Sequence, residues 1–185
     1  EIRLITYSKS LEKYNRYVAS LLNISDPASQ GIITTSESFI QTIIRDAFPG
    51  KQLNYELPIP QKCQEVQDNP LGDDIKDELR NFILPRCITR KEYCEEHIRR
   101  TGRKDQQGEA NRIKIWNAIE AVFNYWNGLP AIPIQYASYL TALKIKNGEY
   151  DVPEKYRVDF LFIDEAQDID YSEYRLLRNV LGKNC

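Results

Sequence analysis

The chain has 185 residues, of which 42% are hydrophobic and 28% charged, a balance that supports one or two compact domains and excludes a disordered or collagen-like chain. Its 25 basic and 27 acidic residues give a net charge of -2, so any nucleic-acid partner must meet a local basic patch. No window approaches the roughly 18 uninterrupted apolar residues of a membrane-spanning helix, and the first residues carry no leader pattern, so we expect a cytoplasmic protein without membrane contact.

Strand and helix alternate over residues 1–50. Apolar residues predict a buried strand at residues 2–6, followed by a helix whose N-cap is Ser8 or Ser10. A second strand is predicted at residues 31–35, and a second helix ends at Pro49-Gly50. The apolar positions at helical spacing are Leu11, Tyr14, Val18, Leu21, Leu22, Phe39, Ile40, Ile43, Ile44 and Ala47. This order is typical of an α/β domain.

Residues 51–133 change the pattern and predict an all-helical insert. A proline-punctuated stretch leads to a helix with Asp73 as its expected N-cap, and the spacing of Thr89 and Glu92 predicts a capping box for another. A longer helix ends at Asn127-Gly128. The positions expected in the core are Ile75, Leu79, Phe82, Ile83, Ile113, Trp116, Val122, Phe123 and Trp126. We interpret the aromatic stripe of the longer helix as packing rather than as a cofactor site.

From residue 134 the chain returns to alternating elements. A helix bearing Tyr136, Leu140 and Leu143 ends at Asn147-Gly148. Residues 158–163 then form an almost uninterrupted apolar strand, which is typical of a central parallel strand buried on both faces. The apolar positions of the closing helix are Leu176, Leu177, Val180 and Leu181.

A zinc site is not indicated. Cys63, Cys87, Cys94 and Cys185 form no CxxC pair, and His97 is the single histidine. We expect free thiols.

The acidic segment after the last strand, Asp164-Glu-Ala-Gln-Asp168, is the sharpest candidate site. Open α/β sheets bind ligands at the carboxyl ends of their strands. A carboxylate such as Asp164 suits a magnesium ion shared with substrate phosphates, and Glu165 could orient or deprotonate an attacking water. The alternative is that Asp164, Glu165 and Asp168 are solvated loop residues that cap the following helix. The apolar strand in front, and Gln167-Asp168 behind, favour the functional interpretation.

With its strand, this segment resembles the Walker B motif, or motif II, of UvrD/Rep-like superfamily one helicases, which reads approximately DE-x-QD. The resemblance implies that Asp164 and Glu165 serve the magnesium ion and that Glu165 activates the hydrolytic water. It places Gln167 near the phosphates of ATP, where it can couple them to motion. It also implies a partial RecA-like, P-loop NTPase type of mostly parallel sheet at residues 1–50 and 134–185, interrupted by the helical subdomain at 51–133.

Two weaker stretches follow the motif order of that family. Residues 5–9 resemble motif Ia, and residues 35–39 resemble the next motif, commonly T-x-H-S-F, with Glu37 where histidine is usual. By this resemblance the residues that contact single-stranded DNA are Thr6, Tyr7, Ser8, Lys9, Thr35, Ser38 and Phe39. Tyr7 is the candidate for stacking on a base, with an ordinary packing role as the alternative. The hydroxyls could donate to phosphates or cap helices.

The insert contains a basic run. Arg99, Arg100, Arg103 and Lys104 could meet phosphates of the duplex junction, since the family's insert lies near the duplex. A solvated helix end or loop is the alternative, and we interpret His97 as a surface residue of this run.

The P-loop of such a helicase is absent from the sequence. GxxxxGK[ST] wraps phosphates with backbone N–H groups, but the two Gly-Lys pairs here are followed by Gln52 and Asn184. In the family the P-loop lies upstream of the strand at residues 2–6, and a second RecA-like domain supplies the arginine fingers. Because the sequence contains no methionine, we expect a piece of a longer protein, unless modified methionines are missing from it.

The expected function is therefore that of a fragment of an ATP-dependent DNA helicase or translocase that uses ATP and Mg²⁺ and is inactive in isolation. Its expected partners are single-stranded DNA, the duplex junction and the remainder of the helicase chain. One alternative is a helicase-like module that binds nucleic acid or protein without ATPase activity. Another is an unrelated phosphotransfer enzyme, which leaves the insert and the two weaker motifs unexplained.

Overall fold

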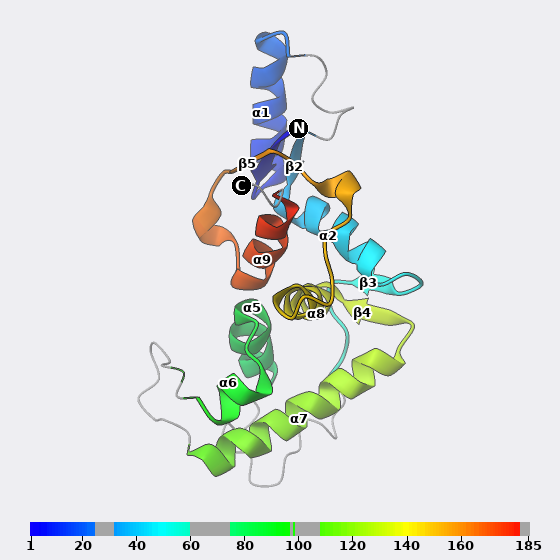
Figure 1. Cartoon of the computed structure of the whole chain (residues 1–185), viewed down its shortest axis with the longest axis vertical. Coiled ribbons are helices and arrows are strands. Elements are labelled where there is room, and N and C mark those ends of the chain that lie inside the picture. The colour runs from blue at the N-terminus through cyan, green and yellow to red at the C-terminus, as the bar shows by residue number, and fades with distance from the viewer. Residues whose placement is uncertain (25–31, 60–74, 97, 99–107, 182–185) are drawn as a thin grey trace. The chain divides into compact units, whose positions relative to one another are not determined.

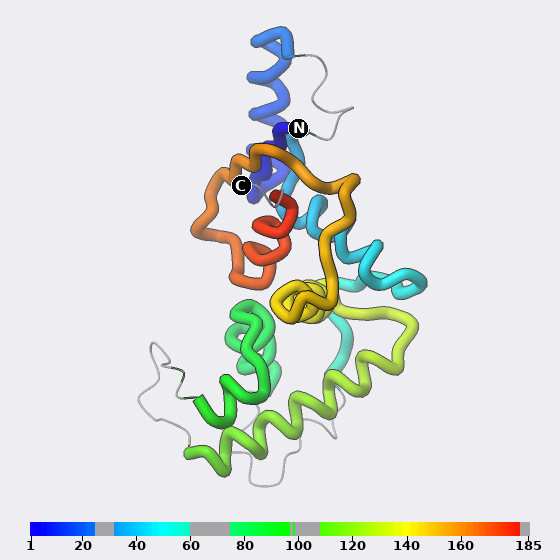
Figure 2. The backbone as a smooth tube through the Cα atoms, viewed as in Figure 1, coloured from blue at the N-terminus to red at the C-terminus, as the bar shows by residue number. Residues whose placement is uncertain are grey.

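The structure is a computed structural model and describes residues 1–24, 32–59, 75–96, 98 and 108–181 (Figure 1). The chain divides into two compact units. Unit 1 comprises Glu1–Pro49 and Ala137–Cys185, and unit 2 comprises Gly50–Tyr136, so the chain leaves unit 1 once and returns to it (Figure 2). The bounds expected from the sequence for the insert are residues 51–133. Each unit is described by itself below.

Unit 1 contains a parallel sheet of three short strands, β1 (Ile2–Thr6), β2 (Ile33–Thr35) and β5 (Phe160–Ile163). Their order is β2-β1-β5, with the first strand of the chain in the centre. Leu4 stands opposite Ile33 on one side and Phe162 on the other. Because the strands are parallel, their carboxyl ends meet at one edge of the sheet. The mixed α/β class expected from the sequence is therefore confirmed.

Four helices belong wholly or partly to unit 1: α1 (Lys9–Leu21), α2 (Ser36–Ala47), α9 (Tyr171–Val180) and, from Ala137 onward, α8 (Ile134–Lys146). Single turns of 3₁₀-helix, η2 (Glu154–Tyr156) and η3 (Ala166–Asp168), flank β5. The apolar faces of two helices are buried as expected, and their buried positions are Phe39, Ile40, Ile43, Ile44, Leu176, Leu177 and Val180. Ile5 of β1 is fully buried with them. The helical periodicity at these positions thus predicted the core of unit 1 correctly.

The apolar stripe of α1 has a different outcome. Its helical spacing is right, and Ser8 is the N-cap, since its hydroxyl accepts from the Leu11 backbone N–H at 3.2 Å. Yet Tyr14, Leu21 and Leu22 are exposed, and Ala19 is the one buried residue of this helix. An amphipathic pattern predicts which helix face can be buried, but the face is buried only where another part of the chain packs against it.

The expectation that residues 158–163 form a central strand buried on both faces is wrong. β5 lies at the edge of the described sheet, and Phe160 and Phe162 are 61% and 57% exposed. Their register with Ile2 and Leu4 places these four apolar residues on one sheet face. α1 packs on β1 and β2, and the exposure of Phe160 and Phe162 means that no described element covers them. An apolar run indicates a strand that tolerates burial, and its neighbours decide whether burial occurs.

Unit 2 is mainly helical, but the expectation of an all-helical insert is wrong. β3 (Gln52–Asn54) and β4 (Ala131–Pro133) pair in parallel as a two-stranded sheet. Three residues are too few to show an alternation of polar and apolar side chains, so the sequence pattern could not reveal these strands. The helices in the described part of unit 2 are α4 (Ile75–Glu78), the π-helical turn η1 (Leu79–Ile83), α5 (Leu84–Arg86), α6 (Arg90–Cys94) and α7 (Glu109–Gly128).

The core of unit 2 is aromatic. The rings of Phe123 and Tyr136 stack with centroids 4.6 Å apart, and Trp126 lies 5.3 Å from Tyr136. Burial raises the pKa of the Tyr136 hydroxyl to about 12. Trp116 is also buried, 5.5 Å from the ring of Tyr93. The interpretation of the aromatic stripe of α7 as packing is thereby confirmed.

Several smaller expectations can be compared with the structure. The capping box is present, with the Thr89 hydroxyl and the Glu92 carboxylate each accepting from the other's backbone N–H. Cys87 and Cys94 are buried and form no disulfide, as expected. Predictions for Gly31, Cys63, Asp73, His97 and Cys185 concern positions outside the described residues. No helix within the described ranges combines the length and apolar character that crossing a membrane requires.

Candidate functional site

The candidate site lies at the carboxyl edge of the parallel sheet in unit 1. β1 ends at Thr6, β2 at Thr35 and β5 at Ile163, so the segments after all three strands emerge at one edge. The Asp164 backbone N–H still donates to the Ile5 carbonyl at 2.9 Å, which holds this residue in the ladder. Asp164 is therefore the last residue of this segment that β-sheet hydrogen bonding fixes, and it is half-buried.

Glu165 turns the chain sharply out of the sheet. Its backbone has φ 56° and ψ 43°, the left-handed region that residues with a Cβ adopt at a cost of roughly 1–2 kcal/mol. The 3₁₀ turn η3 follows, and the Asp168 N–H donates to the Glu165 carbonyl at 3.0 Å. The turn leaves Glu165, Gln167 and Asp168 exposed. Strained backbone at a cluster of polar residues is a recurrent feature of functional sites.

The side chains of Glu165 and Gln167 are joined. The Gln167 amide donates a hydrogen bond to the Glu165 carboxylate, and both residues are exposed. The bond restricts the rotamers of the carboxylate, and the second carboxylate oxygen stays available to accept from a water. Asp164 and Glu165 thus stand on consecutive residues with different surroundings, one fixed by the ladder and one presented to solvent.

The helix that follows this turn, α9, is capped by Asp170 and not by the acidic residues of the turn. Asp170 is the N-cap of α9, and its carboxylate accepts from the Glu173 N–H at 2.8 Å and from the Ser172 hydroxyl at 2.7 Å. The alternative described Asp164, Glu165 and Asp168 as solvated loop residues that cap this helix. Its capping part is wrong, whereas Glu165 and Asp168 are exposed, as its solvated part expects. Their carboxylates are free of that structural role.

The donor set fits a magnesium ion better than a softer metal. Asp164 and Glu165 offer oxygen ligands, and magnesium is usually held by one or two carboxylates with water and substrate phosphates completing the octahedron. Among the described residues there is no group of three or more histidine, cysteine, aspartate and glutamate side chains placed to hold a metal. A magnesium site on these two carboxylates would take its remaining ligands from water and phosphate.

The residues predicted to contact DNA divide into an accessible and a buried group. Tyr7 is 51% exposed, and Lys9 and Ser38 are also exposed. Thr6, Thr35 and Phe39 are buried, and the Arg3 guanidinium lies over the Phe39 ring at 4.3 Å. Those three side chains pack within unit 1.

Two hydroxyls have capping roles. Besides Ser8 at α1, the Thr35 hydroxyl accepts from the Ser38 N–H at 3.2 Å at the start of α2. The helix-capping alternative therefore describes Ser8 and Thr35, whereas Tyr7 and Lys9 at the end of β1 remain accessible. Arg99, Arg100, Arg103 and Lys104 lie outside the described residues.

Two partly buried carboxylates, Asp170 and Glu173, were not singled out from the sequence. Burial raises the pKa of Glu173 to about 7, and the nearby charges of Asp170 and Glu37 add to the shift, partly offset by a hydrogen bond from the Asp170 backbone. Burial also raises the pKa of the Asp170 carboxyl. The Asp-x-x-Glu spacing at the start of α9 is a helix-start signal, but it gives no indication of desolvation.

Comparison with known proteins adds no family to this description, because no protein-family model and no curated protein matches the sequence.

Proposed function

We propose that this chain is part of an ATP-driven DNA translocase or helicase of the UvrD/Rep type and carries its magnesium-binding and water-activating carboxylates. The observation that supports this most strongly is the Asp164-Glu165 pair directly after a parallel strand, at the sheet edge where Tyr7 is also exposed. The structure contributes a second argument, since these carboxylates do not cap α9. The proposal includes a RecA-like fold for unit 1.

The two carboxylates would divide the chemistry between them. Asp164, held by its hydrogen bond to the Ile5 carbonyl, would bind Mg²⁺, which neutralises charge on the transferred phosphoryl group. Glu165 would accept a proton from the attacking water or orient it, because its carboxylate faces solvent. Gln167, already bonded to Glu165, would sense whether that carboxylate is engaged and pass the change to η3.

DNA would be contacted at the end of β1. The exposed ring of Tyr7 offers a stacking platform worth roughly 1–3 kcal/mol per base, and Lys9 supplies a positive charge two residues later. Thr6, Thr35 and Phe39 are left out of the proposed surface because they are buried.

Turnover would also need residues that this sequence lacks. No GxxxxGK[ST] loop occurs in its 185 residues, so we expect the chain alone to bind ATP weakly and to hydrolyse none. A P-loop and a second RecA-like domain would come from the remainder of the helicase chain.

The test is the ATPase activity of the full-length protein with and without single-stranded DNA. Glu165→Gln should lower kcat at least a hundredfold while leaving ATP binding within a few fold. Glu149→Gln, another exposed glutamate of unit 1, is the matched control and should behave as wild type. Stimulated turnover that survives Glu165→Gln would refute the assigned role.

A helicase-like scaffold that lacks ATPase activity even at full length is the second candidate. It predicts no turnover by the full-length protein, with DNA binding intact and unchanged by Glu165→Gln. The same experiment therefore separates the two candidates.

A further inference from the structure

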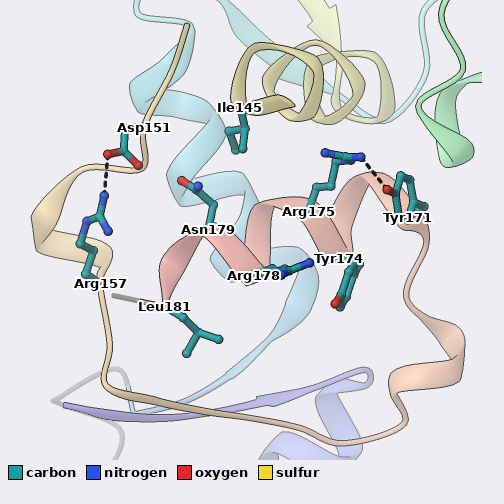
Figure 3. Close-up of a pocket in the computed structure, with 9 residues that line it drawn as sticks. All are labelled: Ile145, Asp151, Arg157, Tyr171, Tyr174, Arg175, Arg178, Asn179 and Leu181. Atoms are coloured by element: carbon teal, nitrogen blue, oxygen red, sulfur yellow. Dashed lines mark hydrogen bonds and ion pairs between the residues drawn. The ribbon is translucent and has the colours of Figure 1, made fainter. Parts of the chain in front are cut away.

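Unit 1 has a pocket that the proposed hydrolytic site does not use. A cavity of about 330 Å³ lies between α9 and the connection that runs from α8 to β5 (Figure 3). Its polar lining comes mainly from one helix face, which presents Tyr171, Tyr174, Arg175 and Arg178. The volume is at the lower end of the range for small-ligand pockets, which fits one compact ligand or one unit of a polymer.

The charge of this pocket is not balanced. Arg157 is neutralised by Asp151 at 2.8 Å and by Glu154 at 3.0 Å. Arg175 and Arg178 have no carboxylate partner within the part of the chain that the structure describes. These two guanidinium groups stand three residues apart on α9, so both lie on the same helix face. Asp151 and Glu154 together carry one negative charge more than Arg157 balances, so the group keeps one net positive charge and offers the two guanidinium groups of Arg175 and Arg178 to an anion.

Aromatic rings accompany the two arginines. Tyr171 and Tyr174 are each 45% exposed, and their rings stack at 6.3 Å with planes 24° apart. Arg175 is held in place from the same side, because its guanidinium donates to the Tyr171 hydroxyl at 2.6 Å and lies over the Tyr171 ring at 4.8 Å. Tyr171 thus orders the arginine, while Tyr174 keeps an accessible ring for a further stacking partner.

We propose that this pocket binds a nucleoside monophosphate unit, with the phosphate on Arg175 and Arg178 and the base against Tyr174. A nucleotide brings a phosphate and a planar ring in one ligand, and arginine forks and tyrosine faces are the groups that recognise them. An acidic peptide would use the arginines and leave the tyrosines without a role. The nucleotide is either one unit of a single-stranded DNA or a free nucleotide from solution. Only binding of single-stranded DNA rests on the proposed function.

Binding is measured by fluorescence anisotropy of a labelled oligo(dT) strand on the full 185-residue chain, with dTMP and inorganic phosphate as competitors. Arg178→Ala and Tyr174→Ala should each weaken strand binding about tenfold. Tyr174→Phe and Arg178→Lys, which keep the ring and the charge, should lose less than threefold. Both tested side chains lie at the surface, so folding should survive, and circular dichroism verifies it.

The salt dependence of strand binding distinguishes a direct phosphate contact from a purely structural role of the same side chain, because only loss of the contact changes it. Loss of one phosphate contact should lower the slope of log K against log salt by about 0.7 in Arg178→Ala and leave it unchanged in Tyr174→Ala. Competition by dTMP at concentrations where inorganic phosphate does not compete would support recognition of the base as well as the phosphate.

The outcomes also separate this inference from the proposed function. Binding lost in the α9 variants supports the inference, whether or not Tyr7→Ala also binds more weakly. Binding lost only in Tyr7→Ala overturns the inference and leaves the proposed DNA contact standing. Displacement of the strand by a polyglutamate peptide as readily as by dTMP overturns it, as does absence of binding by both oligo(dT) and dTMP.

Discussion

Because the backbone of Glu165 is left-handed, we expect the usual stability order of alanine and glycine variants to be reversed at this position. In helices and strands, alanine is more stabilising than glycine by roughly 0.5–1 kcal/mol, because glycine loses more backbone entropy on folding. At φ 56° a Cβ costs roughly 1–2 kcal/mol, and glycine is free of that cost. We therefore expect Glu165→Gly to be more stable than Glu165→Ala by about 0.5–1 kcal/mol.

The matched control is Lys13, an exposed residue inside α1 of the same unit. There Lys13→Ala should be more stable than Lys13→Gly by about 1 kcal/mol. Urea unfolding followed by far-UV circular dichroism measures both pairs, and a difference of 1 kcal/mol corresponds to about 2–4 °C in Tm for a chain of this size. Both tryptophans, Trp116 and Trp126, lie in unit 2, so tryptophan fluorescence follows that unit separately.

The result that would refute the reasoning is a Glu165→Ala variant as stable as Glu165→Gly, or more stable, while the Lys13 pair keeps its normal order. The turn after β5 would then have a conformation open to any residue, and the sharp exit of Glu165 from the sheet would be wrong. A reversed order at Glu165 alone would establish that the candidate base carries backbone strain.

Three further outcomes follow from the structure. Because the pKa of Glu173 is raised to about 7, the native state holds the proton of this carboxyl more tightly than the unfolded state does, so the protein loses stability as pH rises from about 4.5 to 7. Glu173→Gln should therefore be more stable than wild type at pH 8, by on the order of 2 kcal/mol, and equal to it at pH 4. Urea midpoints at the two pH values measure this difference. Asp170→Ala should lower the unfolding free energy by about 1 kcal/mol and Asp168→Ala by less than about 0.5, and equal losses would contradict the assignment of the cap. In unit 2, Tyr93→Phe removes the hydrogen bond that the tyrosine hydroxyl donates to buried Glu78 at 2.9 Å. The urea midpoint followed by tryptophan fluorescence should fall by the equivalent of about 1–2 kcal/mol. An unchanged midpoint would mean that this hydrogen bond contributes little to stability.

Much of the local structure could be predicted from the sequence, because helical periodicity and caps are encoded within a few residues. Phe39 and Ile43 were placed on the buried face of α2 by spacing alone, and Thr89 was placed at a helix start by its distance from Glu92. The acidic segment was located because a run of apolar residues must end where the strand leaves the sheet. These signals depend only on near neighbours in the chain.

The remaining features depend on distant parts of the chain. The pairing of Gln52–Asn54 with Ala131–Pro133 joins segments too short to have a period, and the exposure of Phe162 depends on what lies beside β5. The left-handed turn at Glu165 has no glycine or asparagine to signal it. Desolvation of Glu173 follows from the burial of α9. The RecA-like assignment and the helicase function remain predictions.

Among the described residues β5 is an edge strand, which gives the acidic residues around it a second consequence, for solubility. An apolar edge strand such as Phe160–Ile163 is a template on which another chain can add a strand. Asp159, whose carboxylate pairs with the N-terminal ammonium, stands before it, and Asp164 and Glu165 stand after it, so carboxylates bracket the run as gatekeeper residues do. Like charges from two copies would repel one another most strongly at the end of the strand that carries Asp164 and Glu165. The carboxylates proposed to serve magnesium would thus also oppose self-association at this edge, and we expect acidification, or neutralisation of these residues by substitution, to favour aggregation.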